Sequence, residues 1–279
     1  MPNYGYHLAR LKGDLMRRFY RAVLPIIARR KVNPPRSAPI DVFSYSGENT
    51  LPEQVASIRS FLRYVGRPKN FTVVSDGSHS ERSVQLLERL DPAVSVQLAM
   101  PLPPNHLPEK FRRYLSTHPT GKQLALIMSL PATGPALYID SDVLFFPSAV
   151  DLIGRAGEAG VSAYYLADCQ FFGDARLLRS ASEEEQPVNT GFLLLFEKLD
   201  WSLGISRFLE LEGEPNFFTN QTITHLVMHE NGARSFDPVK YVLQLDDQFV
   251  YPDRYAGAAL ALRHYVNPVR HKFWTSVNQ

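Results

Sequence analysis

The residues best suited to chemistry are two carboxylates that follow an apolar run near the middle of the chain. Residues 136–139 are Ala-Leu-Tyr-Ile, and Asp140, Ser141 and Asp142 come directly after them. Hard divalent cations such as Mg²⁺ and Mn²⁺ prefer oxygen ligands and are often shared with substrate phosphates. A cation held by Asp140 and Asp142 would neutralise a diphosphate leaving group. Two acids one residue apart are also common in loops and helix caps, so the preceding strand strengthens the metal interpretation.

The elements that must position this pair alternate between strand and helix patterns. Apolar runs typical of buried strands occur at 40–45, 71–75, 94–98 and 136–139. Helices are expected at 50–66, where Thr50 and Glu53 form a capping-box pattern, and at 80–90, 108–117 and 121–129. Further on we expect a strand at 188–196, a helix at 217–229 and short strands near 241–245. This order predicts an α/β fold with a mostly parallel sheet and helices on both faces, and such sheets bind ligands beyond the carboxyl ends of their strands.

The first 37 residues form a basic arm that differs from the rest of the chain. Nine of the 30 Lys and Arg residues and one of the 28 Asp and Glu residues lie there, which leaves a mildly acidic body and disfavours nucleic-acid binding. Apolar residues recur in the arm at helical spacing, at Leu8, Leu11, Leu15, Phe19, Val23 and Ile27. A basic amphipathic helix of this kind suits an anionic membrane surface. Packing on the domain or on a partner protein is the open alternative.

Domain organisation and location are predicted from the same features. The Pro-rich stretch 32–39 predicts a linker, so we expect an arm at 1–37 and an α/β domain at 38–279. No run reaches the roughly 18 apolar residues of a spanning helix, and the scattered charges of the arm do not fit a signal peptide. Cys169 is the only cysteine, which is typical of a reducing compartment. We therefore predict a cytoplasmic protein, peripheral at the inner face of the membrane if the arm binds lipid.

Three segments, in the same order along the chain, resemble the family 8 retaining glycosyltransferases, whose fold is called GT-A. Residues 136–145 resemble the family's Asp-x-Asp segment, residues 188–195 (VNTGFLLL) its Asn-x-Gly-hydrophobic segment, and residues 264–274 (HYVNPVRHKFW) its C-terminal His-x-x-Gly-x-x-Lys-Pro-Trp segment. The resemblance implies a Rossmann-like GT-A domain that uses Mn²⁺ or Mg²⁺. It would move a hexose from a nucleotide-sugar, commonly a UDP-sugar, to a glycan or lipid-linked acceptor with retention of configuration.

The resemblance also implies roles for residues around the cation. The implied metal ligands are Asp140, Asp142 and His264, and the nucleotide-sugar would also touch Asp140 and Ser141. Arg270 stands at the family's lysine position and would bind the diphosphate, which a guanidinium can do with two hydrogen bonds. The tail departs from the family at three positions, where its Gly, Pro and Trp are replaced by Asn267, His271 and Lys272. Lys272 thereby becomes a second phosphate candidate.

Other positions are matched to the donor and to catalysis. The implied nucleobase contacts are Ser44, Tyr45 and Asp76, and Lys122 would lie over the donor. The implied sugar contacts are Asp168, Asn189 and Gly191. Asn220 and Gln221 fall where the family carries Asp-Gln, so Gln221 would lie near the anomeric carbon. Asn220 in place of Asp argues against a nucleophilic carboxylate there.

Alternatives remain at this stage. An apolar run before Asp-x-Asp also resembles the first motif of haloacid-dehalogenase-like phosphatases, in which Asp140 would be the nucleophile and Asp246 and Asp247 would bind Mg²⁺. A second alternative is a non-catalytic, membrane-associated nucleotide-sugar-binding protein. Among transferases, inversion would need a carboxylate base, for which Asp246 and Asp247 are the candidates. The acceptor site is expected in the loops 170–187 and 250–260.

Overall fold

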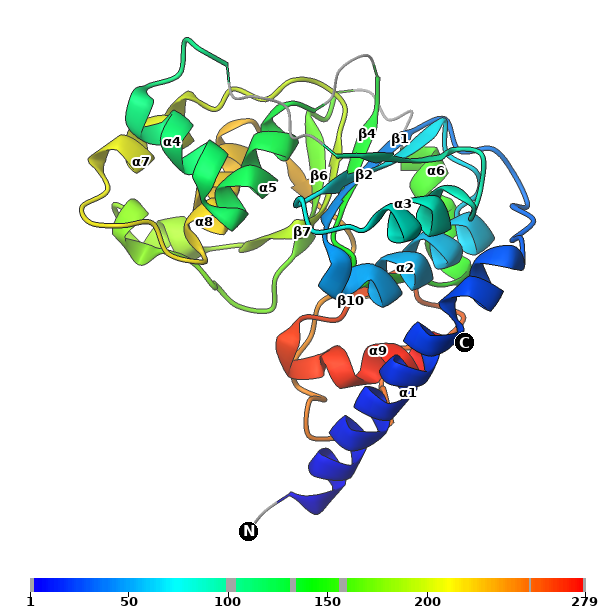
Figure 1. Ribbon diagram of the computed structural model, residues 1–279. Helices are drawn as coiled ribbons and strands as arrows, with labels where there is room; N and C mark the ends of the chain where they lie inside the picture. The colour runs from blue at the N-terminus through cyan, green and yellow to red at the C-terminus, as the bar shows by residue number, and fades with distance from the viewer. Residues whose placement is uncertain (1–2, 99–103, 131–133, 156–159, 251, 278–279) are drawn as a thin grey trace.

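We describe the protein from a computed structural model, in which residues 3–98, 104–130, 134–155, 160–250 and 252–277 are described. Its main sheet has the strand order β3-β2-β1-β4-β7-β6-β8 (Figure 1). The strands are β1 (Asp41–Ser46), β2 (Asn70–Ser75), β3 (Val94–Gln97), β4 (Ala136–Ile139), β6 (Ala163–Ala167), β7 (Val188–Leu195) and β8 (Arg234–Ser235). Strands β1 to β4 run parallel to one another, and β7 is antiparallel to its neighbours β4 and β6. The predicted mostly parallel α/β sheet is confirmed.

Helices cover both faces of the main sheet and make a three-layer molecule (Figure 1). One face carries α2 (Leu51–Tyr64), α3 (Glu81–Glu88) and α6 (Asp151–Arg155), and the other carries α4 (Glu109–Thr117), α5 (Pro119–Met128), α7 (Ser202–Glu210) and α8 (Thr219–Glu230). Successive side chains of a strand point to opposite faces of the sheet. Leu137 and Ile139 of β4 therefore join the core beneath α2, whereas Tyr138 joins the core beneath α5. Because both faces are covered, the whole strand is apolar.

A second, smaller sheet lies beside the first and has the order β5-β10-β9. It consists of β5 (Val143–Phe145), β9 (Tyr241–Val242) and β10 (Leu262–His264), and the C-terminal helix α9 (Arg270–Ser276) follows it. Arg263 of β10 is fully buried and donates hydrogen bonds to the carboxylates of Asp247 and Asp253. Lys272 of α9 pairs with the same Asp247 at 3.2 Å. These buried ion pairs tie α9 to the small sheet.

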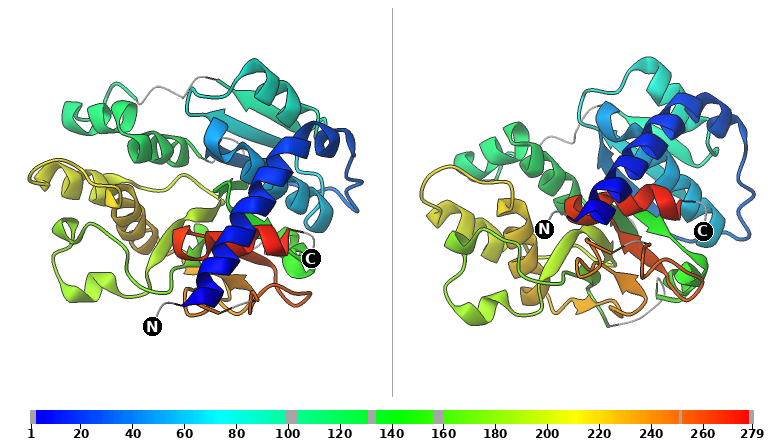
Figure 2. Two further views of the ribbon diagram at one scale, coloured as in Figure 1. Left: turned by 60° about the horizontal axis from the view of Figure 1, so that its bottom comes forward. Right: turned by 90° about the horizontal axis from the view of Figure 1, so that it is seen from below.

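The arm forms one long helix, α1 (Tyr4–Arg29), which lies against α9 (Figure 2). Its buried residues are Ala9, Gly13, Leu24 and Ala28. The first four members of the predicted apolar stripe point outward instead, with exposures of 66% for Leu8, 55% for Leu11, 56% for Leu15 and 70% for Phe19. The predicted helix is confirmed. It packs on the domain through a second face of mostly small residues and keeps most of its apolar stripe free.

The predicted strands and helices of the body are found within a few residues of their expected bounds, but the capping prediction differs. Thr50 precedes α2 without a side-chain hydrogen bond that caps this helix. Glu53 instead accepts hydrogen bonds from Arg17 of α1, one of them 3.1 Å long, because the arm covers this end of α2. Within the described ranges, no helix is both long and apolar enough to cross a membrane.

Candidate active site

Residues 140–142 lie where the chain passes from the main sheet to the small sheet. Strand β4 ends at Ile139 and β5 begins at Val143, so these three residues connect the two sheets. The backbone N–H of Asp140 donates to the carbonyl of Gly191 on β7 at 2.8 Å, which fixes the first residue of the crossing. The carboxylates therefore emerge at the carboxyl end of a buried central strand, as the sequence predicts.

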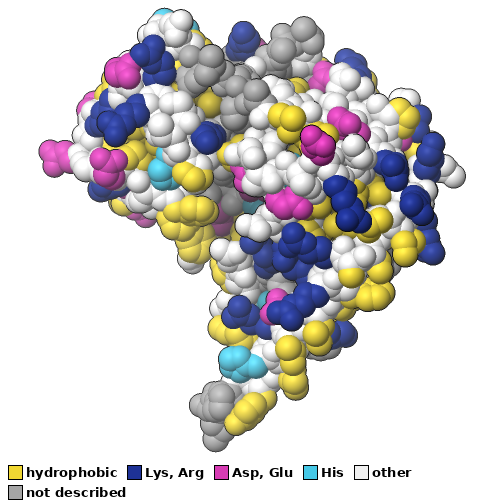
Figure 3. Space-filling view, viewed as in Figure 1, with side chains coloured by type: hydrophobic (Ala, Val, Ile, Leu, Met, Phe, Trp, Pro, Cys, Tyr) yellow, Lys and Arg dark blue, Asp and Glu magenta, His cyan; other side chains and the backbone are white. Residues whose placement is uncertain are grey.

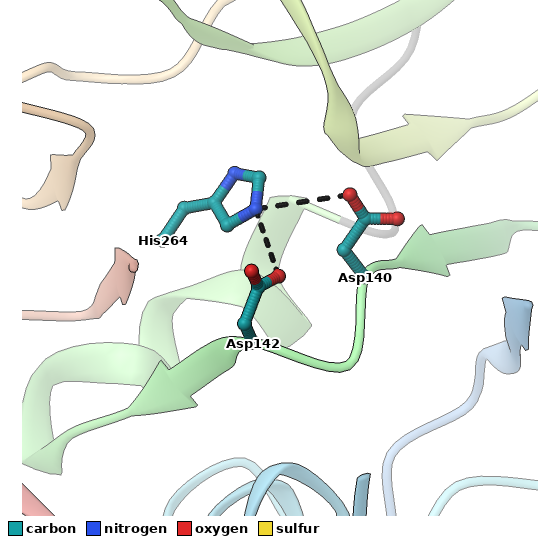
Figure 4. Close-up of side chains that lie close together, drawn as sticks. All are labelled: Asp140, Asp142 and His264. Atoms are coloured by element: carbon teal, nitrogen blue, oxygen red, sulfur yellow. Dashed lines mark hydrogen bonds and ion pairs between the residues drawn. The ribbon is translucent and has the colours of Figure 1, made fainter. Parts of the chain in front are cut away.

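His264 reaches the carboxylates through the pairing of the small sheet. Strand β10 runs antiparallel to β5 with His264 opposite Val143, and Tyr265 N–H donates to the carbonyl of Asp142 at 3.0 Å. His264 Nε2 lies 3.0 Å from Asp142 Oδ1 and 3.7 Å from Asp140 Oδ2 (Figure 4). One ligand atom from each of the three residues lies within 4.8 Å of the other two. Two carboxylates and an imidazole converging in this way form a donor set that fits Mn²⁺ or Mg²⁺.

Asn189 fixes the orientation of the His264 ring. Its Oδ1 accepts a hydrogen bond from Gly191 N–H at 2.9 Å and lies 2.9 Å from His264 Nδ1. An amide oxygen only accepts, so Nδ1 carries a proton and Nε2 faces the carboxylates. The Asn189 amide nitrogen donates to Asp168 Oδ2 at 3.0 Å, which sets the direction of the amide. Metal-binding histidines are held by outer partners of this kind.

Gly191 allows the ring and the carboxylate to approach β7. A Cβ at this position would lie 2.3 Å from His264 Cε1 and 2.8 Å from Asp140 Oδ2. Real Cβ atoms do not come this close, so any side chain at 191 would displace one of the two groups. The sequence predicts a close approach at Gly191, and the groups that approach it here belong to the protein itself.

The charges of the cluster depend on one another. Burial acts to raise the pKa of the Asp142 carboxyl, but His264 and Arg270 outweigh it and hold that pKa well below its usual range. Burial raises the pKa of Asp140. Burial opposes a charge on His264, but Asp142 and Asp140 outweigh it and the pKa of His264 is raised. Because metal ligands must be deprotonated, a cation that binds here must displace the proton on His264.

Arg270, the first residue of α9, contacts Asp142 Oδ2 with its guanidinium. Its side chain is 43% exposed, and its Nε has no hydrogen-bond partner among the described residues. It lines the same cavity, of about 290 Å³, as Asp140, Asp142 and His264. Arg270, which was predicted to bind the diphosphate, thus lies next to the predicted metal ligands and still has N–H groups free to donate.

Gln123 of α5 is a site residue that the sequence analysis missed. Its Nε2 donates to Asp140 Oδ1 at 3.0 Å, and its Oε1 accepts from Asn220 Nδ2 at 2.9 Å. It lines the cavity, as does Asn220, whereas the predicted Lys122 does not. An uncharged residue inside a helical pattern carries no signal for such a role. Several apolar lining residues, such as Phe217 and Phe218, were missed for the same reason.

The predicted sugar contacts line the same cavity. Gln221 Nε2 donates to the carbonyl of Phe172 at 2.8 Å and lies 3.3 Å from Asp168 Oδ2. Asp168 also accepts from Cys169 N–H and from Asn189. Asp168, Asn189 and Gln221 all line the cavity. A continuous chain of hydrogen bonds therefore links the predicted sugar contacts, through Asn189, to the predicted metal ligand His264.

The structure leaves several predicted residues outside the cavity lining. The Ser44 hydroxyl donates to Gln54 of α2 at 2.8 Å, and Ser141 is buried. Tyr45 lies near the end of β1 and Asp76 directly follows the neighbouring β2. Burial together with the charge of Asp76 raises the pKa of Tyr45 to about 12. The Lys272 ammonium is buried and donates to the carbonyls of Val250 and Pro252, in addition to its pair with Asp247. These three partners match the three N–H groups of the ammonium, so Lys272 has no donor left for a phosphate.

The alternative acids lie apart from the cluster. Asp247 is fully buried against Arg263, with 2.7 Å between Oδ1 and the guanidinium. Asp246 accepts from the Tyr255 hydroxyl and is 54% exposed. Neither residue lines the cavity that holds Asp140. The geometry therefore favours neither a shared Mg²⁺ with Asp140, as the phosphatase alternative requires, nor a catalytic base from this pair.

Comparison with solved structures identifies the fold. No family model and no curated protein matches the sequence. The galactosyltransferase LgtC, solved with donor and acceptor sugar analogues, aligns over 85% of this chain and 95% of its own, with 15% identity and a TM-score of 0.57. Mouse xyloside xylosyltransferase 1 aligns over 84% of this chain and 99% of its own, with 13% identity and a TM-score of 0.53.

The glycosyltransferase GlyE of Streptococcus pneumoniae TIGR4 aligns over 88% of this chain and 61% of its own, with 15% identity and a TM-score of 0.52. These neighbours, together with the sheet and its flanking helices, define the protein as one with the GT-A fold of glycosyltransferases. The fold predicted from the three sequence segments is confirmed.

Proposed function

We propose that the protein is a metal-dependent glycosyltransferase that moves a sugar from a nucleotide-sugar to a glycan or lipid-linked acceptor. The observation that carries this proposal is the convergence of Asp140, Asp142 and His264 beside Arg270 in one cavity. Oxygen and imidazole ligands next to a guanidinium suit a divalent cation bound beside a diphosphate. The GT-A fold supports the same function, since LgtC was solved with donor and acceptor sugar analogues.

Asp140, Asp142 and His264 would hold the cation, which we propose to be Mn²⁺ or Mg²⁺. Such a cation supplies neutralisation of the charge that develops on a nucleoside diphosphate leaving group. Asn189 keeps His264 Nε2 directed at the carboxylates, and Gln123 holds one oxygen of Asp140 so that the other faces the histidine. Arg270 would bind the diphosphate through the N–H groups that Asp142 does not use.

The donor is proposed to be a UDP-sugar whose sugar ring lies against Asp168, Asn189 and Gln221. Gln221 would face the anomeric carbon, and the nucleobase would lie toward Tyr45 and Asp76, with Lys122 nearby. Transfer breaks the bond between the anomeric carbon and the diphosphate oxygen and forms one to the acceptor hydroxyl oxygen. We propose that the departing phosphate takes the hydroxyl proton from the same face, which retains the configuration. Asn220 donates a hydrogen bond to Gln123, and its amide cannot act as a nucleophilic carboxylate.

A thermal-unfolding screen of nucleotide-sugars with and without Mn²⁺ tests the proposal, because a ligand that binds only the folded chain raises its stability. We expect a UDP-sugar to raise the midpoint only when Mn²⁺ is present, and slow donor hydrolysis to accompany it. Asp142→Asn should lose both effects, while Asp246→Asn, which changes an exposed acid outside the cavity, should keep them.

The same samples separate the alternatives. Phosphate release from p-nitrophenyl phosphate without donor hydrolysis would favour the phosphatase. A donor that binds but is neither hydrolysed nor transferred to any acceptor tested would favour a non-catalytic binding protein. Equal turnover by the wild type and Asp142→Asn would contradict the metal site itself.

We also propose that α1 attaches the protein to an anionic membrane surface, at the inner face of the cytoplasmic membrane. Its outward stripe of Leu8, Leu11, Leu15 and Phe19 is exposed, and Lys and Arg side chains lie beside apolar ones along the helix in Figure 3. Apolar side chains that enter the interface beside cations that meet anionic lipid are the features of a surface-bound helix.

Vesicle flotation tests the membrane proposal with the full chain. The wild type should float with vesicles that contain phosphatidylglycerol, and Leu11→Gln with Leu15→Gln should weaken flotation strongly because both side chains are exposed and unlinked to the core. Leu98→Gln, which changes a leucine of similar exposure on the body, is the matched control. Equal flotation of all three proteins would contradict a role for the stripe.

A further inference from the structure

A second cavity, of about 560 Å³, lies between α1, α2 and α9, away from the candidate active site. We call it the arm groove. Its walls are mostly apolar and include Phe19, Val23, Ile26, Ile27, Trp274 and Val277. Phe19 and Ile26 are also 70% and 55% exposed, so they belong both to this groove and to the outward surface of α1. The groove is therefore continuous with the surface that we propose to meet the membrane.

Three arginines line the same groove. Arg59 of α2 donates to the carbonyls of Ile27 and Arg30 at the end of α1, and Arg63 follows it by one helical turn. Burial, together with the charges of Arg30 and Arg63, lowers the pKa of Arg59. None of the three forms an ion pair with an acid anywhere in the described residues. Three positive charges are thus held close together without a counter-charge, and an anion would relieve their repulsion.

Trp274 supplies a second polar feature that lacks a partner. Its ring is 2% exposed, lines the groove and packs against Tyr20 with the centroids 5.0 Å apart. Among the described residues, no group accepts a hydrogen bond from its Nε1. Buried indole N–H groups normally have a hydrogen-bond partner, so this donor is unsatisfied in a residue that lines the groove.

We propose that the arm groove binds one molecule of an anionic phospholipid. The acyl chain would lie along the apolar wall formed by α1 and α9, and the acidic headgroup would meet Arg30, Arg59 and Arg63. The ester carbonyl or phosphate oxygens of the lipid, which lie between its acyl chain and its headgroup, would accept a hydrogen bond from Trp274 Nε1. A free phosphate would leave the apolar wall uncovered, and a zwitterionic lipid would bring its own cation to the arginines. The site is separate from sugar transfer and uses a single lipid, whereas the stripe on α1 would meet the bilayer surface.

Fluorescence of Trp274 reports on this groove directly. The chain has two tryptophans, and Trp201 lies in the core on the other side of the main sheet. In the full-length Trp201→Phe variant, phosphatidylglycerol with short brominated chains, kept below its micelle concentration, should quench Trp274 saturably. Phosphatidylcholine with the same chains should bind at least about tenfold more weakly. Inorganic phosphate should not compete at concentrations comparable to the lipid.

Charge variants complete the test. Arg30→Gln with Arg63→Gln should weaken quenching by phosphatidylglycerol at least about tenfold, because two of the three charges are removed. Arg18→Gln with Arg29→Gln removes two exposed charges of α1 that do not line the groove, and it should leave the affinity unchanged.

Absence of saturable quenching, equal affinity for both lipids, equal loss in both double variants, or competition by phosphate at similar concentration would overturn the proposal. If Trp201→Phe does not fold, the thermal midpoint of the wild type with unbrominated short-chain lipid answers the same comparisons. The lipid is monomeric in these measurements, so their failure is distinct from failure of vesicle flotation or of donor binding.

Discussion

Gln123 shows how one neutral side chain can support a charged site. It donates to Asp140 Oδ1 and accepts from Asn220, and Tyr138 donates to the same carboxylate oxygen at 2.9 Å. The second oxygen of Asp140 is thereby left toward His264. Outer partners of this kind govern ligand direction without touching the cation.

We therefore expect Gln123→Leu to lower Mn²⁺ affinity, and donor turnover with it, by about 10- to 100-fold, a typical effect of losing an outer partner. Titration calorimetry with Mn²⁺ measures the first effect and donor hydrolysis the second. Lys122→Leu, one residue earlier on the same helix and outside the cavity lining, is the comparison and should leave Mn²⁺ affinity unchanged. An equal or larger loss of Mn²⁺ affinity in Lys122→Leu would contradict the role proposed for Gln123.

The site could be predicted from sequence only where a local pattern or a family motif marked a residue. Asp140 and Asp142 directly follow an apolar strand, and parallel sheets bind ligands at the carboxyl ends of their strands, so the sequence alone marks this pair. His264 lies 122 residues from Asp142, and only the resemblance brought it forward. Gln123 has no charge or motif to mark it. Lys272 was marked because it is basic, yet burial beside Asp247 decides its role, and burial of a lysine is not visible in the chain.

At the scale of elements, α1 was predicted as a helix but its packed face was not. The stripe of large apolar residues is the stronger signal, and from the sequence it fits a membrane surface, a partner protein or the domain. The structure packs the domain against a face that includes Ala9, Gly13 and Ala28 instead. Small residues bury little area and so carry little periodic signal, although they let two helices approach closely. Similarly, β1 to β4 and β7 were predicted from short apolar runs, whereas β8 (Arg-Ser) and β10 (Leu-Arg-His) carry no such run and were not predicted. The pairing of β5 with β10 is a long-range contact that no local run encodes.

Gly13 tests how closely α1 is packed. A Cβ there would lie 2.6 Å from the carbonyl oxygen of His271 on α9. Inside a helix, Gly→Ala normally stabilises by about 0.5–1 kcal/mol. We expect Gly13→Ala to reverse this sign and lower the thermal midpoint, because backbone atoms of α9 cannot move aside easily. Gly5→Ala on the same helix, whose Cβ would meet only Asn3 Oδ1 at 3.5 Å, should be neutral or slightly stabilising. A higher midpoint for Gly13→Ala would mean that α1 is not held against α9.

The buried ion pairs that hold α9 to the small sheet predict a pH dependence. Burial acts to raise the pKa of Asp247, but the hydrogen bonds and charge of Arg263 outweigh it and the pKa is lowered. A carboxyl whose pKa is lower in the folded than in the unfolded chain stabilises the fold above its unfolded pKa, about 3.9. That stability is lost as the pH falls through the folded value.

We therefore expect Asp247→Asn to cost about 3–5 kcal/mol at pH 7, because it leaves Arg263 and Lys272 buried with one carboxylate fewer. The difference from the wild type should shrink as the pH falls from about 5 towards 3. Urea unfolding at each pH measures it, and Asp246→Asn, which changes an exposed neighbour, should show almost no difference at any pH. A gap that stays constant with pH would mean that the charge of Asp247 does not contribute.

At the scale of the whole molecule, α9 connects the two proposed binding regions. Its first residue, Arg270, lines the candidate active site, and Trp274, one turn later, lines the arm groove. Helix α1 lies along the same element and projects from the body with the N-terminus at its tip (Figure 1). A membrane bound by α1 would thus lie next to the element that carries the diphosphate contact. This arrangement suits an acceptor that is itself linked to lipid.

The uneven distribution of charge along the chain predicts how charge variants and salt change binding to vesicles. The arm is basic and the body is mildly acidic, so most of the attraction to an anionic bilayer surface should come from the arm. Each Lys or Arg near such a surface contributes about 1 kcal/mol. Replacing exposed Arg18 and Arg21 with Gln should therefore weaken partitioning into phosphatidylglycerol vesicles about thirtyfold. Added salt should weaken the wild type in the same direction, since the screening length falls to about 8 Å at physiological ionic strength.

Lys198→Gln with Arg234→Gln removes the same net charge from exposed positions on the body and should leave partitioning close to that of the wild type. The donor-induced rise in thermal midpoint should be the same in all three proteins, which keeps membrane binding and the sugar site separate. Equal weakening by both double variants would show that net charge, rather than the arm, governs attachment. Partitioning that is insensitive to salt would assign it to the apolar stripe alone.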